Sequence, residues 1–339
     1  MDTANALLRW SSLLNGNVAS LLPSFSAMEK QSAVILSRQK RHDQSIKRRS
    51  YLIRVPKDFN GKQDTVVFEF QDILSTCASL LRDPRVVSKP EDFHISANTL
   101  DSDGNREYTT ELNSGDWWLR TMEKERLIGM EDTMSILAIL LFIDKTIVTR
   151  RGRHSYPIIL TIGNFTYEAR KAKAAHRIIG YLPVLANLAE SNTNDFETAD
   201  FKLRNTCFDL LFASVCKAYA DGGVFMDVCG KMLCMIPLIP FIIQDSQEGN
   251  KLCFVLSSNK TAYPCRICWT PRTELADENG TNSKRLRTQA EVKNYILGIV
   301  DRLEERVHGT VVELRDQARK ISVHPVSNSL WNLPWGANV

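Results

Sequence analysis

Two aspartates end the most hydrophobic runs of this 339-residue chain. Asp144 follows the apolar run 135–143, and Asp245 follows the run 234–244. Runs of this length are typical of strands buried on both faces, and a carboxylate just past such a strand can face a cleft. If the two strands are neighbours, the carboxylates converge and can hold Mg²⁺ ions that activate a water or a 3′-hydroxyl. The alternative is that each aspartate is a turn or helix-cap residue.

A cysteine pair is the second group that could carry chemistry. Cys265 and Cys268 are spaced as CxxC, a knuckle that can give two thiolates to a tetrahedral Zn²⁺. A structural zinc site needs four ligands, and Cys253 and His324 are the candidates for the other two, without support from their spacing. Two ordinary thiols at a turn are the alternative. A redox role is less favoured, because no thioredoxin-like βαβ pattern surrounds the pair.

Hydrophobic patterning predicts the elements that would position these groups. Strands are expected over 136–143, 156–162 and 234–245, with "RRGR" as a turn between the first two. A long helix is expected before the "DGG" of 221–223, since glycine commonly stops a helix. Its apolar face is formed by Phe208, Leu211, Phe212, Val215 and Tyr219.

Three polar segments are predicted from their composition. The segment 165–183 is expected to start with a basic helix, Arg170–Arg177, and to stop at a proline. Residues 188–200 are expected to form a loop, and residues 283–320 a single charged helix with an apolar stripe.

The chain is expected to have four parts: a basic, weakly ordered leader (1–60), an N-terminal accessory region (64–125), a mixed α/β core with the CxxC knuckle (133–275), and a charged helix with a tail (283–339). In the accessory region, "TVVFEFQDILSTCASLLRD" (65–83) changes from strand-like to helix-like patterning. Trp117 and Trp118 are interpreted as core anchors.

Overall composition narrows the classes of protein. Hydrophobic residues make up 43% and charged residues 24%, which excludes wholesale disorder, and the net charge of +4 is too small to indicate nucleic-acid binding by itself. No apolar run approaches the roughly 20 residues that cross a bilayer, so no membrane partner is expected. Eight cysteines without a secretory signal indicate reduced thiols.

A basic segment, "SRQKRHDQSIKRRSYLIRVPK", lies near the start of the chain. It is typical of a nuclear-import signal or a phosphate-binding arm, and the alternative is a solvated linker. It favours the nucleus over the cytoplasm. No GxxxxGK[ST], GxGxxG, HExxH or GxSxG motif is present, which argues against P-loop NTPases, Rossmann dehydrogenases, zincins and α/β-hydrolases.

Several longer motifs occur in a fixed order. They are "GDWW" (115–118), "DKT" (144–146), "SYPIILTIGN" (155–164), "ARKAKAAHRIIGYLP" (169–183), "YPCRIC" (263–268) and "LWNLP" (330–334). Together they resemble the Plavaka-type transposases, a branch of the CACTA group of cut-and-paste DNA transposons. The resemblance covers roughly residues 65 to 339.

The resemblance implies an incomplete RNase H-like core that cleaves and joins DNA through a DDE acid triad and two ions, Mg²⁺ or Mn²⁺. Asp144 matches the first acid of the family, and Asp245 matches the aspartate of its DYPEQ block, taken as the second acid. No residue matches the third acid, so the resemblance implies a chain truncated before its C-terminal half. The family commonly has Asp-Gly before the second acid, where this chain has Cys229–Gly230.

DNA is the partner that the resemblance implies, and an oligomer stays open. The residues expected to contact DNA phosphates are Arg150, Arg151, Arg153, Arg170 and Lys171. The alternatives to an active transposase are a non-catalytic DNA-binding protein, a transposon fragment without function, and a zinc-dependent interaction module.

Overall fold

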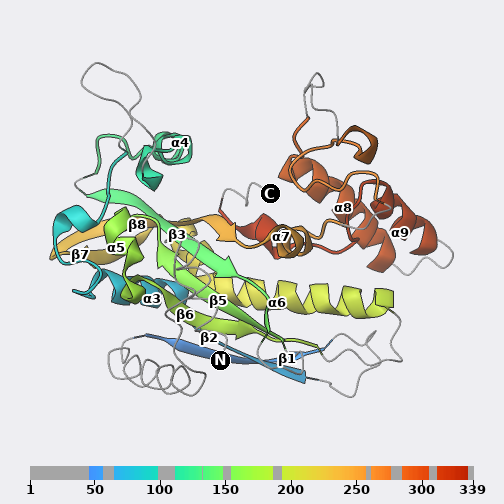
Figure 1. Cartoon of the computed structure of the whole chain (residues 1–339), viewed down its shortest axis with the longest axis horizontal. Helices are drawn as coiled ribbons and strands as arrows, with labels where there is room; N and C mark the ends of the chain where they lie inside the picture. Colours follow the sequence, from blue (N-terminus) through green and yellow to red (C-terminus); the bar gives the residue numbers. More distant parts are fainter. Residues whose placement is uncertain are drawn as a thin grey trace, which may run out of the picture. The chain divides into compact units, whose positions relative to one another are not determined.

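The computed structural model describes residues 46–55, 65–97, 111–131, 133–147, 154–185, 193–256, 261–275, 285–304 and 311–334. The chain divides into two compact units. The first unit comprises Met1–Tyr51, Phe68–Val184 and Ala218–Pro237, and the second comprises Leu52–Val67, Leu185–Lys217 and Leu238–Val339. Figure 1 shows the helices and strands along the chain.

The described strands form an eight-stranded sheet, and Figure 1 labels most of them. Its strands are β1 (Arg48–Arg54), β2 (Thr65–Gln71), β3 (Met134–Ile143), β4 (Thr146–Ile147), β5 (His154–Ile162), β6 (Arg177–Leu182), β7 (Val224–Val228) and β8 (Lys231–Ile243). They lie in the order β1-β2-β6-β5-β3-β8-β7, and β4 pairs with β5 beside this row. The sheet and the helices together confirm the predicted mixed α/β class.

Both strand directions occur in this sheet. β3, β5 and β6 are antiparallel neighbours, with Leu141 opposite Leu160 in the first pair. β8 starts level with β3, because the Cys234 amide donates a 2.9 Å hydrogen bond to the carbonyl of Thr133, the residue before β3. Two strands that start at one edge of a sheet run in parallel, so β3 has an antiparallel neighbour on one side and a parallel one on the other.

The strands predicted from apolar runs are confirmed. Residues 136–139 of β3 are fully buried, as expected for a strand covered on both faces. β8 forms in spite of Pro237 and Pro240, which lack the N–H that a ladder needs. Both prolines lie beyond Met235, the residue opposite the first residue of β7, so no β7 residue faces them.

Seven α-helices are described: α3 (Ile73–Leu81), α4 (Asp116–Lys124), α5 (Tyr167–Lys171), α6 (Thr193–Ala220), α7 (Ser246–Leu252), α8 (Gln289–Glu304) and α9 (Val311–Lys320). Short 3-10 helices cover Pro90–Asp92, Leu112–Ser114, Lys173–Ala175, Arg272–Glu274 and Ser329–Asn332. α6 confirms the long helix that ends before "DGG". Of the two tryptophans in α4, Trp118 is a fully buried anchor, as predicted, and Trp117 is half-buried.

The predicted basic helix Arg170–Arg177 is wrong. α5 ends at Lys171, and Arg177 is the first residue of β6. The helix stops because tertiary contacts satisfy its end: the ring Nε2 of His176 lies 2.8 Å from the Arg170 carbonyl. Arg177 then pairs with Asp83, which follows α3, at 2.8 Å. Both contacts outweigh the local helix preference of the alanine-rich segment.

Three other predictions change in part. The loop expected over 188–200 is helical from Thr193 onward, where α6 begins. The single charged helix expected over 283–320 is two helices, α8 and α9, which contact each other. Residues 48–54, expected to belong to the leader, form β1 at one end of the strand row.

Candidate functional site

Asp144 lies at an interruption between two strands that share one register. Ile143 of β3 faces Ile158, and Thr146 of β4 faces Ser155. β3 and β4 therefore continue one antiparallel register along β5. In this register the residue opposite Asp144 is Pro157, which has no amide hydrogen for a ladder bond. Pro157 therefore cannot donate a ladder bond opposite Asp144, and Asp144 is exposed directly after a buried strand.

Asp245 is the N-cap of α7. Its Oδ1 accepts a 2.7 Å hydrogen bond from the backbone N–H of Glu248, and its own backbone is extended, as N-cap residues usually are. The helix-cap interpretation of this aspartate is thus confirmed. A cap bond uses one oxygen, and the residue is exposed. Capping and metal binding are compatible, because the second carboxylate oxygen, Oδ2, takes no part in this bond.

A network of charged side chains lies next to Asp245 in sequence. Glu248 is buried, and its Oε1 lies 2.7 Å from Lys251 Nζ. Its Oε2 lies 3.9 Å from Arg204 Nη1 in α6, and Arg204 also pairs with Asp200 at 2.8 Å. The network joins α7 to α6 inside the second unit. Sequence analysis missed it, although the i,i+4 spacing of Asp200 and Arg204 is a signal for a helical ion pair.

Two of the five residues expected to bind DNA are described. The Arg170 guanidinium donates to the carbonyl oxygens of Phe165 (2.8 Å) and Gly163 (3.2 Å), and it pairs with Glu111 at 3.2 Å. Its side chain is only 19% exposed, so it holds the turn after β5 together. Lys171 is more exposed and pairs with Glu168 at 3.1 Å. Arg150, Arg151 and Arg153 lie outside the described residues.

The "TIGN" end of β5 contains a structural residue that sequence analysis missed. Asn164 is fully buried, and its Oδ1 accepts from the Ala138 amide at 2.9 Å. Its Nδ2 donates to the carbonyls of Ile136 (2.8 Å) and His94 (2.9 Å). Next to it, a Cβ on Gly163 would collide with Leu112. A buried amide side chain that replaces backbone partners is difficult to recognise from one sequence, because asparagine is also the commonplace turn residue.

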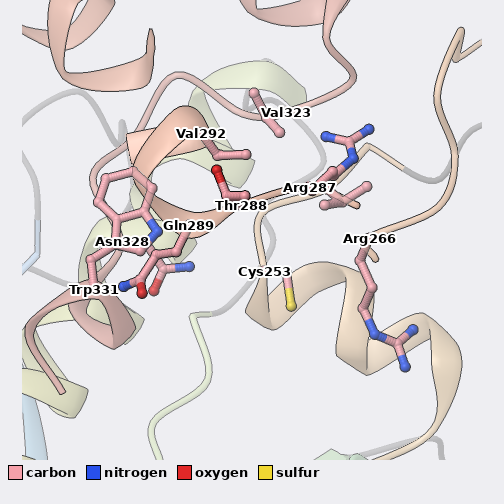
Figure 2. Close-up of a pocket in the computed structure, with 10 residues that line it drawn as sticks. Cys253, Arg266, Arg287, Thr288, Gln289, Val292, Val323, Asn328 and Trp331 are labelled. Carbon is pink, nitrogen blue, oxygen red and sulfur yellow. The ribbon is translucent and has the colours of Figure 1, made fainter. Parts of the chain in front are cut away.

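The four candidate zinc ligands belong to the second unit. Cys265 is half-buried and Cys268 is buried. Cys253 lines a small pocket together with Arg266 and Arg287 (Figure 2). Burial raises the pKa of the Cys253 thiol to about 12, against the opposing charge of Arg266. The fourth candidate, His324, packs its ring 4.4 Å from that of Phe201, and burial lowers its pKa to about 4.

Cys229 and Gly230, where the family pattern has Asp-Gly, form the tight turn between β7 and β8. Val228 faces Lys231 across the turn, and both turn residues have positive φ, 52° at Cys229 and 81° at Gly230. This is the type I′ hairpin turn, for which Asp-Gly and Asn-Gly are preferred. The departure from the family pattern is therefore a change in the first residue of this turn, where Cys229 stands in place of an aspartate.

Asp144 belongs to the first unit, and Asp245, Cys265 and Cys268 belong to the second. Within the described part of the chain, no three His, Cys, Asp or Glu side chains gather in a way that could hold a metal ion. No described helix is both long and apolar enough to cross a membrane.

The fold and these sites define an α/β protein with exposed acids at the ends of two apolar strands. A family model described as Plavaka transposase matches residues 38–334, which is most of the chain. The chain therefore belongs to the Plavaka transposase family. No curated protein matches it.

Proposed function

We propose that this protein is a transposase-derived DNA-binding protein in which Asp144 and Asp245 hold Mg²⁺ or Mn²⁺ in an RNase H-like core. Such ions, when bound, activate an attacking oxygen and stabilise the leaving oxygen of a phosphodiester. The two aspartates would supply hard carboxylate oxygens, the ligand type that these ions prefer. Membership of a transposase family supports DNA as the partner.

The order of the elements supports the fold part of the proposal. Three consecutive strands, β3, β5 and β6, are antiparallel neighbours. The long helix α6 follows, and the chain then returns to the sheet through β7 and β8, with β8 beside β3. A strand, two hairpin strands, a helix and a returning strand are the order that an RNase H-like core requires.

The number of residues between one hydrogen bond and each aspartate supports the metal part of the proposal. The Cys234 amide bonds to the Thr133 carbonyl, which sets the register at the start of β8 and β3. Eleven residues lead from Thr133 to Asp144, and eleven lead from Cys234 to Asp245. Each aspartate therefore follows the end of its own strand at the same number of residues from this hydrogen bond, and this equal spacing supports the proposal.

Isothermal titration of Mn²⁺ into the native chain tests this proposal. We expect binding that weakens at least about tenfold in Asp144→Asn and in Asp245→Asn, since each variant removes one of the anionic ligands that Mn²⁺ prefers. Asparagine is also a good N-cap residue, so Asp245→Asn removes the charge and keeps the cap of α7. Asp209→Asn, an exposed change on α6, is the matched control and is expected to bind as the native chain does.

Equal Mn²⁺ affinity in the native chain and the Asp144→Asn, Asp245→Asn double variant would refute the shared site. Non-catalytic DNA binding is the second candidate function, and the composition of β1 favours it: Arg48, Arg49 and Arg54 are all exposed on this strand. Duplex binding that falls steeply with salt, and that is the same with and without Mn²⁺, would select this candidate.

A further inference from the structure

The CxxC segment is one arm of a short two-stranded ladder. Cys268 faces Leu286 in an isolated antiparallel bridge. The Trp269 amide donates to the Arg285 carbonyl at 2.9 Å, and the Arg287 amide donates to the Ile267 carbonyl at 2.8 Å. Backbone bonds therefore hold the cysteines against the residues just before α8.

Arg287 joins this ladder to the rest of the second unit through its side chain. The guanidinium is buried and donates to three carbonyl oxygens: those of Cys268 (3.3 Å), Ile321 (3.1 Å) and Tyr263 (2.8 Å). It also lies 4.1 Å from the centre of the Trp269 ring, within the range of a cation–π contact. One side chain thus connects the segment before the knuckle, the knuckle itself and the end of α9.

The thiols do not fit a four-ligand zinc site. Cys253 lines a pocket whose charged side chains are the cations Arg266 and Arg287, which oppose a divalent cation beside this thiol. The Cys268 sulfur lies 2.9 Å from the Thr270 hydroxyl, and the Cys265 sulfur accepts the Ile267 amide at 3.4 Å. Among the residues that the structure describes, no further His, Cys, Asp or Glu side chain completes a metal-binding group around the pair.

A positive charge is nevertheless present beside the two sulfurs. The Arg287 guanidinium donates to the carbonyl oxygen of Cys268 itself at 3.3 Å, so its charge lies at the knuckle. A zinc ion in a CxxC knuckle does two things: it neutralises sulfur charge, and it crosslinks segments that are distant in sequence. The contacts of Arg287 with three carbonyl oxygens perform the crosslinking, and they bring a positive charge to the knuckle.

We infer that Arg287 takes the structural place of a zinc ion, so that the C-terminal part of the second unit folds without metal and Cys265 and Cys268 bind none. The inference stands apart from the proposed site at Asp144 and Asp245. Zinc would bind the cysteines, whereas Mg²⁺ or Mn²⁺ would bind the carboxylates.

Metal analysis and thermal unfolding of the native chain test the inference. Chain purified under reducing conditions from zinc-containing medium is expected to hold far less than one zinc per chain, and a zinc chelator is expected to leave Tm unchanged. One zinc per chain, together with a fall in Tm on chelation, would overturn the inference. Both measurements use the native chain, so they remain decisive if a variant fails to fold.

Two arginine variants on the same segment supply the contrast. Arg287→Met is expected to lower Tm by about 5–10 °C, because three buried carbonyls lose their donor. Arg287→Lys is expected to lie between this variant and the native chain, since lysine keeps the charge without the planar fork of donors. The matched control is Arg285→Met, whose side chain is 71% exposed, and it is expected to shift Tm little. An Arg287→Met variant as stable as this control would also overturn the inference.

Discussion

Replacing Asp83 by Asn is expected to destabilise the protein more than replacing its buried partner Arg177 by Met. Asp83 and Arg177 are 8% and 5% exposed, and their 2.8 Å ion pair joins the end of α3 to the start of β6. Asp83 has a second partner: Arg85 donates from Nε at 2.8 Å, from Nη2 at 2.6 Å and from its backbone amide at 3.0 Å. Asp83 therefore keeps its hydrogen bonds from Arg85 when Arg177 is replaced, whereas Arg177 loses its carboxylate partner when Asp83 is replaced.

The magnitudes follow from this asymmetry. Asp83→Asn leaves the Arg177 cation buried without a carboxylate, and breaking a buried pair in this way costs about 3–5 kcal/mol. Arg177→Met removes one charged hydrogen bond from a carboxylate that keeps three donated by Arg85, and it leaves an apolar side chain in the same space. It also removes the Nη1 donor of the Ala174 and His176 carbonyls. We expect a cost of about 1–2 kcal/mol. The difference is a sizeable share of a typical folding stability of about 5–15 kcal/mol.

Urea unfolding followed by circular dichroism measures these costs for the native chain, both single variants and the double variant. Arg85→Met is the control, because the Arg85 side chain is 59% exposed and an exposed partner contributes at most about 1 kcal/mol. The reasoning fails if Arg177→Met is as costly as Asp83→Asn, or if the double variant shows that the two changes are additive.

Two further predictions concern buried polar groups. Asn164→Leu leaves the Ala138 amide and the Ile136 and His94 carbonyls without the Asn164 side chain as partner. We expect the free energy of unfolding to fall by about 3 kcal/mol or more in the same urea assay. A fall below about 1 kcal/mol would contradict the role of Asn164. Burial lowers the pKa of His176 from 6.5 to about 4, although its hydrogen bond to a backbone carbonyl acts the other way. A lowered pKa means that this stability is fully present above about pH 6.5 and is lost as the pH falls toward 4, by up to about 3 kcal/mol. His176→Gln keeps a hydrogen-bond donor but does not titrate. We expect its urea midpoint to change less with pH across this range than that of the native chain. An unchanged pH dependence of the midpoint would exclude His176 as the cause.

The sequence predicts the elements whose signal is local. β3 and β8 follow from continuous apolar runs, and the apolar face of α6 follows from helical spacing. Their order also allowed the two strand-terminal aspartates to be proposed as a pair. These features depend on burial along one segment, which is visible in the residues themselves.

The features that were missed depend on contacts between distant segments. α5 ends at Lys171 because His176 and Asp83 hold the chain that follows it, and the alanine-rich segment itself favours a helix. Arg287, expected to lie inside a charged helix, precedes α8 and binds carbonyls up to 34 residues away. Asp245 shows a further difficulty, since one side chain can cap a helix and still offer a metal ligand.

The "TIGN" turn has an evolutionary consequence. Gly163 and Asn164 serve the packing of β3 and β5, so selection retains them for as long as the product must fold. The carboxylates of Asp144 and Asp245 are exposed, and their loss would leave that packing intact. Duplicate copies of this gene should therefore decay in two stages, with substitutions at 144 and 245 tolerated first and substitutions at 163 and 164 tolerated only after folding is no longer selected. The order of these changes among copies would record when each copy lost the proposed metal site.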